Sequence, residues 1–254
     1  MPTQERAFRT PALVLKRRDF GEADRLLTVV TPRYGKFDVI AKGARKPTSS
    51  KTGHVELFTR VDMLVNRGRE LHILNQVQLQ EPYLPLREDL QRGAYAYYAA
   101  ELLDRFTEQG EDDLHELYDL LIATLDRICA EDEPRLALRY YEMRLLDIVG
   151  FRPELTECVV THEPIQPEDQ YFSFAGGGAV SPQGAVHSSA GLVSVSMTTL
   201  KILRHLQRSP YGHVASLKLA DGLHADVERV MQGYLVHLLE RRLQSVDFIR
   251  RIRR

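Results

Sequence analysis

The fold is decided by residues 55–79, VELFTRVDMLVNRGRELHILNQVQL. Apolar residues alternate with polar ones there, first at Val55, Leu57, Val61, Met63 and Val65 and then at Leu71, Ile73, Val77 and Leu79. This period of two is typical of a β-strand with one buried face. The loop NRGR at residues 66–69 separates the two runs. The stretch therefore predicts an antiparallel hairpin.

Three more short strands are predicted upstream of this hairpin. They cover residues 12–17, 26–30 and 37–42, and the turn Pro32-Arg33-Tyr34-Gly35 joins the last two. Five short strands in about 70 residues suit a small closed barrel, because closure pairs the edge strands that a sheet of this size cannot otherwise protect.

The hydrophobic period changes after Pro82 and Pro85. Apolar residues then recur every three to five positions over residues 86–106, 114–128 and 138–148, which predicts three amphipathic helices. Their short connectors favour antiparallel neighbours in a bundle. Helical spacing returns at residues 197–206 and 227–238.

A loop-rich stretch, residues 151–195, separates the two helical segments. Prolines and glycines punctuate it, and its one strong strand candidate is residues 171–174. Long irregular inserts in compact proteins usually have a structural staple or a function.

The overall charge of the 254-residue chain conceals a strong asymmetry. Its formal net charge is -1, and its 43% hydrophobic content excludes a disordered chain. Residues 1–80 hold 15 Lys and Arg against 8 Asp and Glu, residues 81–200 hold 8 against 22, and residues 201–254 hold 11 against 5. Two basic ends thus flank an acidic middle, a pattern that suggests that the basic regions meet an anion.

Several classes of protein are excluded by simpler features. Cys129 and Cys158 are too few for a disulfide framework, and residues 1–11 lack the apolar core of a signal peptide. No apolar run approaches the roughly 18 residues needed to cross a bilayer. We therefore expect a cytoplasmic protein that does not span a membrane.

No catalytic motif is found. Gly176-Gly177-Gly178 resembles a phosphate-binding loop only in composition, since no Lys-Ser/Thr follows it, and a tight turn is the simpler interpretation. Glu22 and Asp24 could share a magnesium ion in a nuclease, but the neighbouring Arg25 favours solvated turn charges. An enzyme, such as this nuclease, is therefore the last of the interpretations, and we expect no cofactor and no small-molecule substrate.

The positive signal is cationic. Basic residues lie at the strand ends and in the loops of the predicted barrel, with Phe20, Tyr34 and Phe37 interleaved: Arg17, Arg18, Arg33, Lys36, Lys42, Arg45, Lys46 and Lys51. Such a surface can track a phosphate backbone while its rings stack on unpaired bases. Alternatively, the cations form a solubilising face and the rings belong to the barrel core, and composition alone leaves both interpretations open.

Two segments resemble the bacterial RecO recombination-mediator family. Residues 21–46, GEADRLLTVVTPRYGKFDVIAKGARK, are similar to its N-terminal signature, in which a hairpin is followed by an AKGARK loop. Residues 137–151, ALRYYEMRLLDIVGF, resemble its central helix. The resemblance continues through Cys158 and residues 171–173 to the C-terminal helices, and so spans essentially the whole chain.

The resemblance implies a multidomain α+β fold. Residues 1–81 would form an OB-fold barrel, residues 82–150 and 196–254 a helical domain, and residues 151–195 a zinc-ribbon-like insert that lacks most of its cysteines. It further implies a non-enzymatic, nucleoid-associated DNA-repair protein that binds single- and double-stranded DNA and anneals complementary strands. Such a protein helps load recombinase onto DNA coated with single-strand-binding protein. Its partners would be RecR and the acidic C-terminal tail of the coating protein.

The resemblance also suggests site residues. DNA contacts carry over most directly to Lys42, Arg45 and Lys46, whereas those of Arg17, Arg33, Tyr34, Lys36 and Lys51 rest mainly on charge, ring chemistry and position. For the partner tail, Arg139 is the first candidate and Arg144 the second, because a cation near apolar surface can pair with a terminal carboxylate. Both arginines could instead be ordinary charges of a helix surface.

The insert departs from its metal-binding relatives. Those members carry two C-x-x-C pairs, whereas this chain has Cys158 with Thr161 and then Ser181 with Gly184. Cys158, His162 and His187 would offer only three ligands at irregular spacing. We therefore expect the insert to fold without metal.

The alternative for the whole chain is a scaffold of the repair complex that does not bind DNA.

Overall fold

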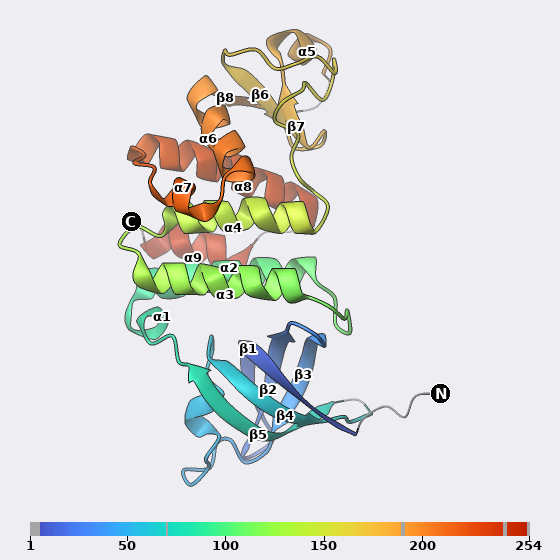
Figure 1. The fold of residues 1–254 in the computed structure, drawn as a ribbon, viewed down its shortest axis with the longest axis vertical. Helices are drawn as coiled ribbons and strands as arrows, with labels where there is room; N and C mark the ends of the chain where they lie inside the picture. Colours follow the sequence, from blue (N-terminus) through green and yellow to red (C-terminus); the bar gives the residue numbers. More distant parts are fainter. Residues whose placement is uncertain (1–5, 70, 189–190, 241–242, 253–254) are drawn as a thin grey trace. The chain divides into compact units, whose positions relative to one another are not determined.

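The structure is a computed structural model that describes residues 6–69, 71–188, 191–240 and 243–252 (Figure 1). By internal contacts the chain divides into two compact units, Met1–Ala130 with Phe248–Arg254, and Glu131–Asp247. The domain bounds predicted from the sequence stay predictions.

The first unit contains a closed five-stranded barrel, as predicted. Its strands are β1 (Ala7–Phe20), β2 (Asp24–Thr31), β3 (Gly35–Ala41), β4 (Arg60–Asn66) and β5 (His72–Glu81). Around the barrel the order is β1-β2-β3-β5-β4, and β4 pairs with β1 to close it. Only the pairing of β3 with β5 is parallel. This arrangement is that of an OB-like barrel.

The strand prediction was correct for the barrel but misplaced two bounds: β1 is longer than the predicted residues 12–17, and β4 is shorter than the apolar pattern indicated. Val61, Met63 and Val65 point inward from β4 and are fully buried. The strand does not reach back to Val55, because a short 3-10 turn (Thr52–His54) and a positive φ of 60° at Phe58 bend the chain before Arg60. Val55 and Phe58 are nevertheless buried. The apolar pattern therefore predicted correctly that this segment is buried, but it did not show that the segment lies outside the strand.

Helices complete the first unit. They are α1 (Pro85–Glu88), α2 (Leu90–Phe106) and α3 (His115–Ala130), and α2 packs against α3. Asp89 caps α2, because its carboxylate accepts hydrogen bonds from the backbone N–H groups of Gln91 and Arg92. The helix α9 (Gln244–Ile252) crosses the boundary between the units.

In the second unit, a helical cluster carries a small sheet. The helices are α4 (Arg135–Ile148), α6 (Met197–Arg208), α7 (Tyr211–Ala215) and α8 (Asp221–Leu239), and α4 contacts the other three. The insert holds β6 (Gln170–Ser173), β7 (Gly178–Val180), α5 (Pro182–Val186) and β8 (Leu192–Val195). The sheet order is β7-β6-β8, and β6 corresponds to the predicted strand.

The glycine run lies in the turn between β6 and β7. Ser173 pairs with Gly178 across this hairpin, Gly177 has a positive φ of 67°, and the Ser173 hydroxyl accepts a hydrogen bond from the Gly176 N–H. The tight-turn interpretation is therefore confirmed. Among the helices of the described residues, none combines the length and the apolar character that crossing a bilayer requires.

Candidate nucleic-acid interface

The basic loop after β3 is tied to the hairpin between β1 and β2. The Gly43 N–H donates to Asp24 Oδ1 at 2.7 Å, and the Arg45 N–H donates to the Ala23 carbonyl at 2.9 Å. Ala44 is fully buried in the barrel core and anchors the loop from within. The half-buried Asp24 carboxylate thus holds the loop in place, whereas only Glu22 is exposed, as expected for a solvated turn charge.

This anchoring presents three cations to solvent. Lys42, Arg45 and Lys46 are exposed. The Arg45 guanidinium donates hydrogen bonds to the Gly21 and Glu22 carbonyl oxygens and lies 3.4 Å from the Asp19 carboxylate. Among the described residues, neither Lys42 nor Lys46 has an ion-pair partner.

An exposed ring lies on the same hairpin. Phe20 ends β1 immediately before Gly21, whose φ of 57° makes the turn, and it is 40% exposed. An exposed phenylalanine flanked by cations is the combination that stacks on unpaired bases while the cations hold phosphates. We name Phe20, Lys42, Arg45 and Lys46 the hairpin cluster.

Other predicted contacts lie at the opposite end of β3. Arg33 and Tyr34 form the turn that precedes β3, and the seven residues of β3 separate this turn from Lys42 by about 20 Å. Tyr34 packs on Phe8, with 4.1 Å between ring centroids, and the Arg67 guanidinium lies 5.7 Å from its ring. The predicted residues therefore form two groups and not one surface.

Lys36 is inside the first unit and not on its surface. Its ammonium donates to the Asp104 carboxylate at 3.1 Å and to the carbonyls of Asp104 and Thr107, each at 2.7 Å. Its side chain is only 7% exposed. Because these acceptors, on α2 and at its C-terminal cap, lie far away in the sequence, the strand pattern carried no signal of this burial. The Lys36 ammonium is therefore not available to hold a phosphate.

Lys51 and Arg17 are also engaged within the protein. The Lys51 ammonium donates to the Leu74 carbonyl at 2.9 Å, and burial lowers the pKa of Lys51 despite the nearby Asp24 carboxylate. Arg17 forms a 2.5 Å ion pair with Glu56 and is one-third exposed. Both residues remain near the barrel surface, but part of their bonding capacity is already used.

The two arginines predicted for tail binding differ in accessibility. Arg139 is 4% exposed and pairs with Glu142 at 2.9 Å. Arg144 is 26% exposed, lies 5.0 Å from the centre of the Tyr140 ring, and donates to the Ser209 carbonyl at 3.0 Å. Arg144 is therefore the more reachable cation on α4.

Comparison with known proteins decides the family. The model of the recombination protein O N-terminal region matches residues 6–83, and that of its C-terminal region matches residues 87–247. The chain belongs to the RecO family. Membership supports a role in DNA repair and recombination.

Curated relatives match this chain along almost its whole length. The DNA repair protein RecO of Roseiflexus sp. is 38% identical over 250 residues, which are 98% of this chain and 87% of the relative. The protein of the same name from Desulforamulus reducens is 33% identical over 245 residues, 96% of this chain and 94% of the relative. The DNA repair protein RecO of Dehalococcoides mccartyi strain BAV1 is 31% identical over 251 residues, which are 99% of this chain and 98% of the relative.

The insert of this RecO chain does not fit a zinc ion. The Cys158 sulfur is fully buried and accepts hydrogen bonds from the backbone N–H groups of Thr161 and Ser181 at 3.4 and 3.3 Å. A Cβ added to Gly184 would lie 2.7 Å from that sulfur. The four positions of the expected C-x-x-C pairs thus meet, but only one of them is a thiol. The described residues contain no group of three His, Cys, Asp or Glu side chains that could hold a metal.

Hydrogen bonds to the buried Cys158 sulfur offset the effect of burial on its pKa. Burial alone would raise the pKa of the Cys158 thiol, but the bonds from Ser181 and Thr161 outweigh it and lower the pKa to about 6. His162 and His187 are both exposed. The zinc-ribbon character of the insert stays a prediction.

Proposed function

We propose that this chain is a DNA-binding recombination mediator of the RecO family. It binds single- and double-stranded DNA, anneals complementary strands, and helps load recombinase onto DNA coated with single-strand-binding protein, without catalytic activity of its own. The proposal places it in the cytoplasm in association with the nucleoid. The observation that carries the proposal is the hairpin cluster, with three exposed cations beside an exposed ring.

The anchored loop suits phosphate binding. Its backbone is held by Asp24 and Ala23, so that little ordering is needed when DNA binds. Neutralising three phosphates of a single strand gives a slope of about -2 in a plot of log K against log salt concentration. Binding should therefore weaken steeply as salt rises.

Charge reversal tests this interface. We would replace Lys42, Arg45 and Lys46 together with glutamate and measure the affinity for a labelled single strand across a salt series. A matched control reverses Lys201, Arg208 and Lys218, three exposed cations of the second unit. We expect the first variant to lose affinity and most of its salt slope, and the control to keep both. Unchanged affinity in the first variant, or equal losses in both, would refute the proposed interface.

Partner binding belongs to the second unit in this proposal. We propose that the acidic tail of single-strand-binding protein docks near Arg144, whose guanidinium lies on the Tyr140 ring, with the buried Arg139 behind it. Arg144→Ala should weaken binding of a labelled tail peptide and leave binding of bare DNA unchanged. Equal peptide binding by the variant would show that the tail docks elsewhere.

Annealing and RecR binding are tested on the full chain. Complementary oligonucleotides coated with single-strand-binding protein should anneal faster when the chain is added, and gel filtration should show a complex with RecR. A chain that binds RecR but no bare oligonucleotide would instead be the scaffold of the alternative interpretation.

A further inference from the structure

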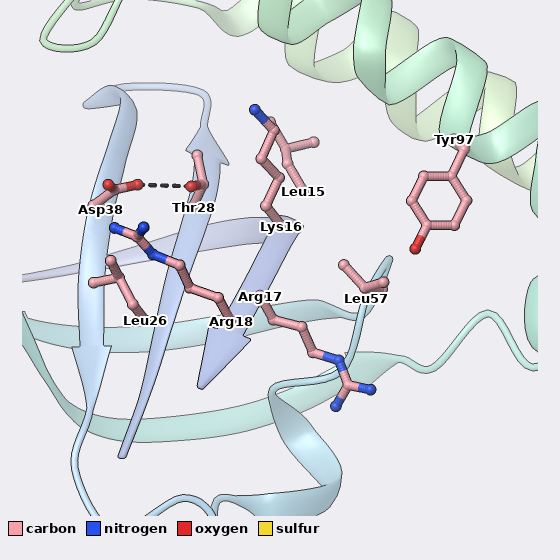
Figure 2. A pocket seen from close by; sticks show the side chains of 9 residues that line it. All are labelled: Leu15, Lys16, Arg17, Arg18, Leu26, Thr28, Asp38, Leu57 and Tyr97. Carbon is pink, nitrogen blue, oxygen red and sulfur yellow. Dashed lines mark hydrogen bonds between the residues drawn. The ribbon is translucent and has the colours of Figure 1, made fainter. Parts of the chain in front are cut away.

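A groove of about 390 Å³ opens on the barrel of the first unit (Figure 2). On β2, Leu27 and Val29 belong to the barrel core, so Leu26 and Thr28 lie on the outer face, where they line the groove. Its other walls come from β1, from Leu57, and from Tyr97 on α2. The volume is at the lower end of the range for small-ligand sites, about 300–1,000 Å³.

The rim of the groove carries excess positive charge. Asp104 is shared by two lysines, Lys16 at 2.5 Å and Lys36 at 3.1 Å. Because one carboxylate cannot neutralise two ammonium groups, the exposed Lys16 keeps part of its field toward solvent.

A second carboxylate is also shared by two cations. Next to Lys16 on β1, Arg17 pairs with Glu56 at 2.5 Å, and Glu56 also pairs with Arg25 at 2.8 Å. Arg18 has no ion-pair partner within the described part of the chain, and it is exposed. Against these cations the groove lining contains a single carboxylate, Asp38. The groove is therefore suited to an anionic ligand.

An exposed aromatic ring faces the groove. Tyr97 is 47% exposed, and Figure 2 shows its side chain extending from α2 toward Leu57. The buried Phe58 holds it edge-on, with 5.0 Å between ring centroids and 85° between ring planes. Phe58 in turn donates its N–H to the Val14 carbonyl at 2.9 Å. The ring is thus supported from behind by a segment hydrogen-bonded to β1.

One polar pair lies on the strand wall. The Thr28 hydroxyl donates to Asp38 Oδ1 at 2.7 Å, drawn as a dashed line in Figure 2. A carboxylate can also accept a hydrogen bond from the exocyclic amino group of cytosine. The groove thus combines an aromatic wall, an acceptor and a cationic rim.

We propose that this groove binds one unpaired nucleotide of a DNA strand, with its base against Tyr97 and its phosphate beside Arg18 and Lys16. The inference rests on the proposed DNA-binding function and adds a base-binding site to it. The groove and the hairpin cluster share strand β1, because Arg18 of the groove is two residues from Phe20 and Arg45 pairs with the intervening Asp19. A base in a duplex is paired and stacked, so it cannot enter such a groove.

Abasic DNA separates stacking from charge. We would measure the affinities of Tyr97→Ala and Tyr97→Phe for an oligo-dC strand, for an abasic strand of equal length and for a duplex. Stacking on one base should make Tyr97→Ala about tenfold weaker for oligo-dC. Its affinities for the abasic strand and the duplex should not change, and Tyr97→Phe should behave as wild type. Tyr171→Ala is the matched control, because Tyr171 is 37% exposed in the second unit.

The outcomes distinguish this inference from the function on which it rests. If Tyr97→Ala binds oligo-dC as well as wild type while reversal of the hairpin cluster abolishes binding, DNA binding stands and the groove site is refuted. Equal weakening for oligo-dC and abasic DNA would also refute it, as would a loss confined to binding of an acidic peptide. If wild type binds no DNA, the proposed function itself fails.

Discussion

Replacing Lys36 with methionine should destabilise the first unit by about 3 kcal/mol. Methionine preserves much of the apolar stem, so packing changes little and the loss is mainly electrostatic. The substitution leaves the Asp104 carboxylate and two carbonyl oxygens without their buried ammonium donor. Removing one partner of a buried pair costs about 3–5 kcal/mol, and the remaining bond from Lys16 to Asp104 favours the lower end of that range.

Urea unfolding followed by circular dichroism would measure this loss. Lys42→Met is the matched control, because Lys42 is exposed and should change the free energy of unfolding by less than about 0.5 kcal/mol. Under conditions where both variants are folded, Lys36→Met should bind single-stranded DNA as wild type does, whereas Lys42→Met should bind more weakly. Equal stabilities of the two variants would refute the structural role of Lys36, and a loss of DNA affinity in Lys36→Met would return it to the interface.

Two further predictions concern the same unit. Burial raises the pKa of Asp104, but hydrogen bonds from its two lysine partners lower it more, so the folded-state pKa lies below the usual value. The stabilisation by the ionised Asp104 is therefore complete above about pH 4 and is lost as the pH falls through the lowered pKa. In an acid titration, wild type should lose more of its free energy of unfolding than Asp104→Asn. Parallel plots of the free energy of unfolding against pH for the two proteins would contradict this. Gly35→Ala should lower the thermal midpoint sharply, because Gly35 has a φ of 63° and an added Cβ would lie 1.6 Å from the Glu111 carbonyl oxygen. Gly53→Ala, where nothing lies within 4 Å, should have little effect on the midpoint, and similar shifts in the two variants would show that the Gly35 turn relaxes.

Local patterns predicted much of the fold. Alternation along residues 61–65 reflects the strand geometry, in which successive side chains face opposite sides, and these residues form β4. The three- to five-residue spacing after Pro85 corresponds to α2, α3 and α4. Family motifs in residues 21–46 and 137–151 indicated the RecO family, which the comparisons confirm.

The same local patterns could not separate the cations. Lys36 is the second residue of β3, and Lys42 directly follows the strand. The two side chains are chemically identical, yet Lys36 is buried against α2 and Lys42 is exposed. Arg139 pairs with Glu142 on its own helix at 2.9 Å, but its second carboxylate partner, Glu228 at 4.0 Å, lies on α8, far along the chain. The groove beside Tyr97 likewise joins residues from β1, β2 and α2.

The sequence by itself thus determined the strands, the helices, the barrel and the family, because hydrophobic periodicity and short motifs depend on neighbouring residues. Only the tertiary structure decided which cations are free to meet an anion. The physical reason is that a charge is neutralised or left available by groups tens of residues away, as Asp104 shows by pairing with both Lys16 and Lys36.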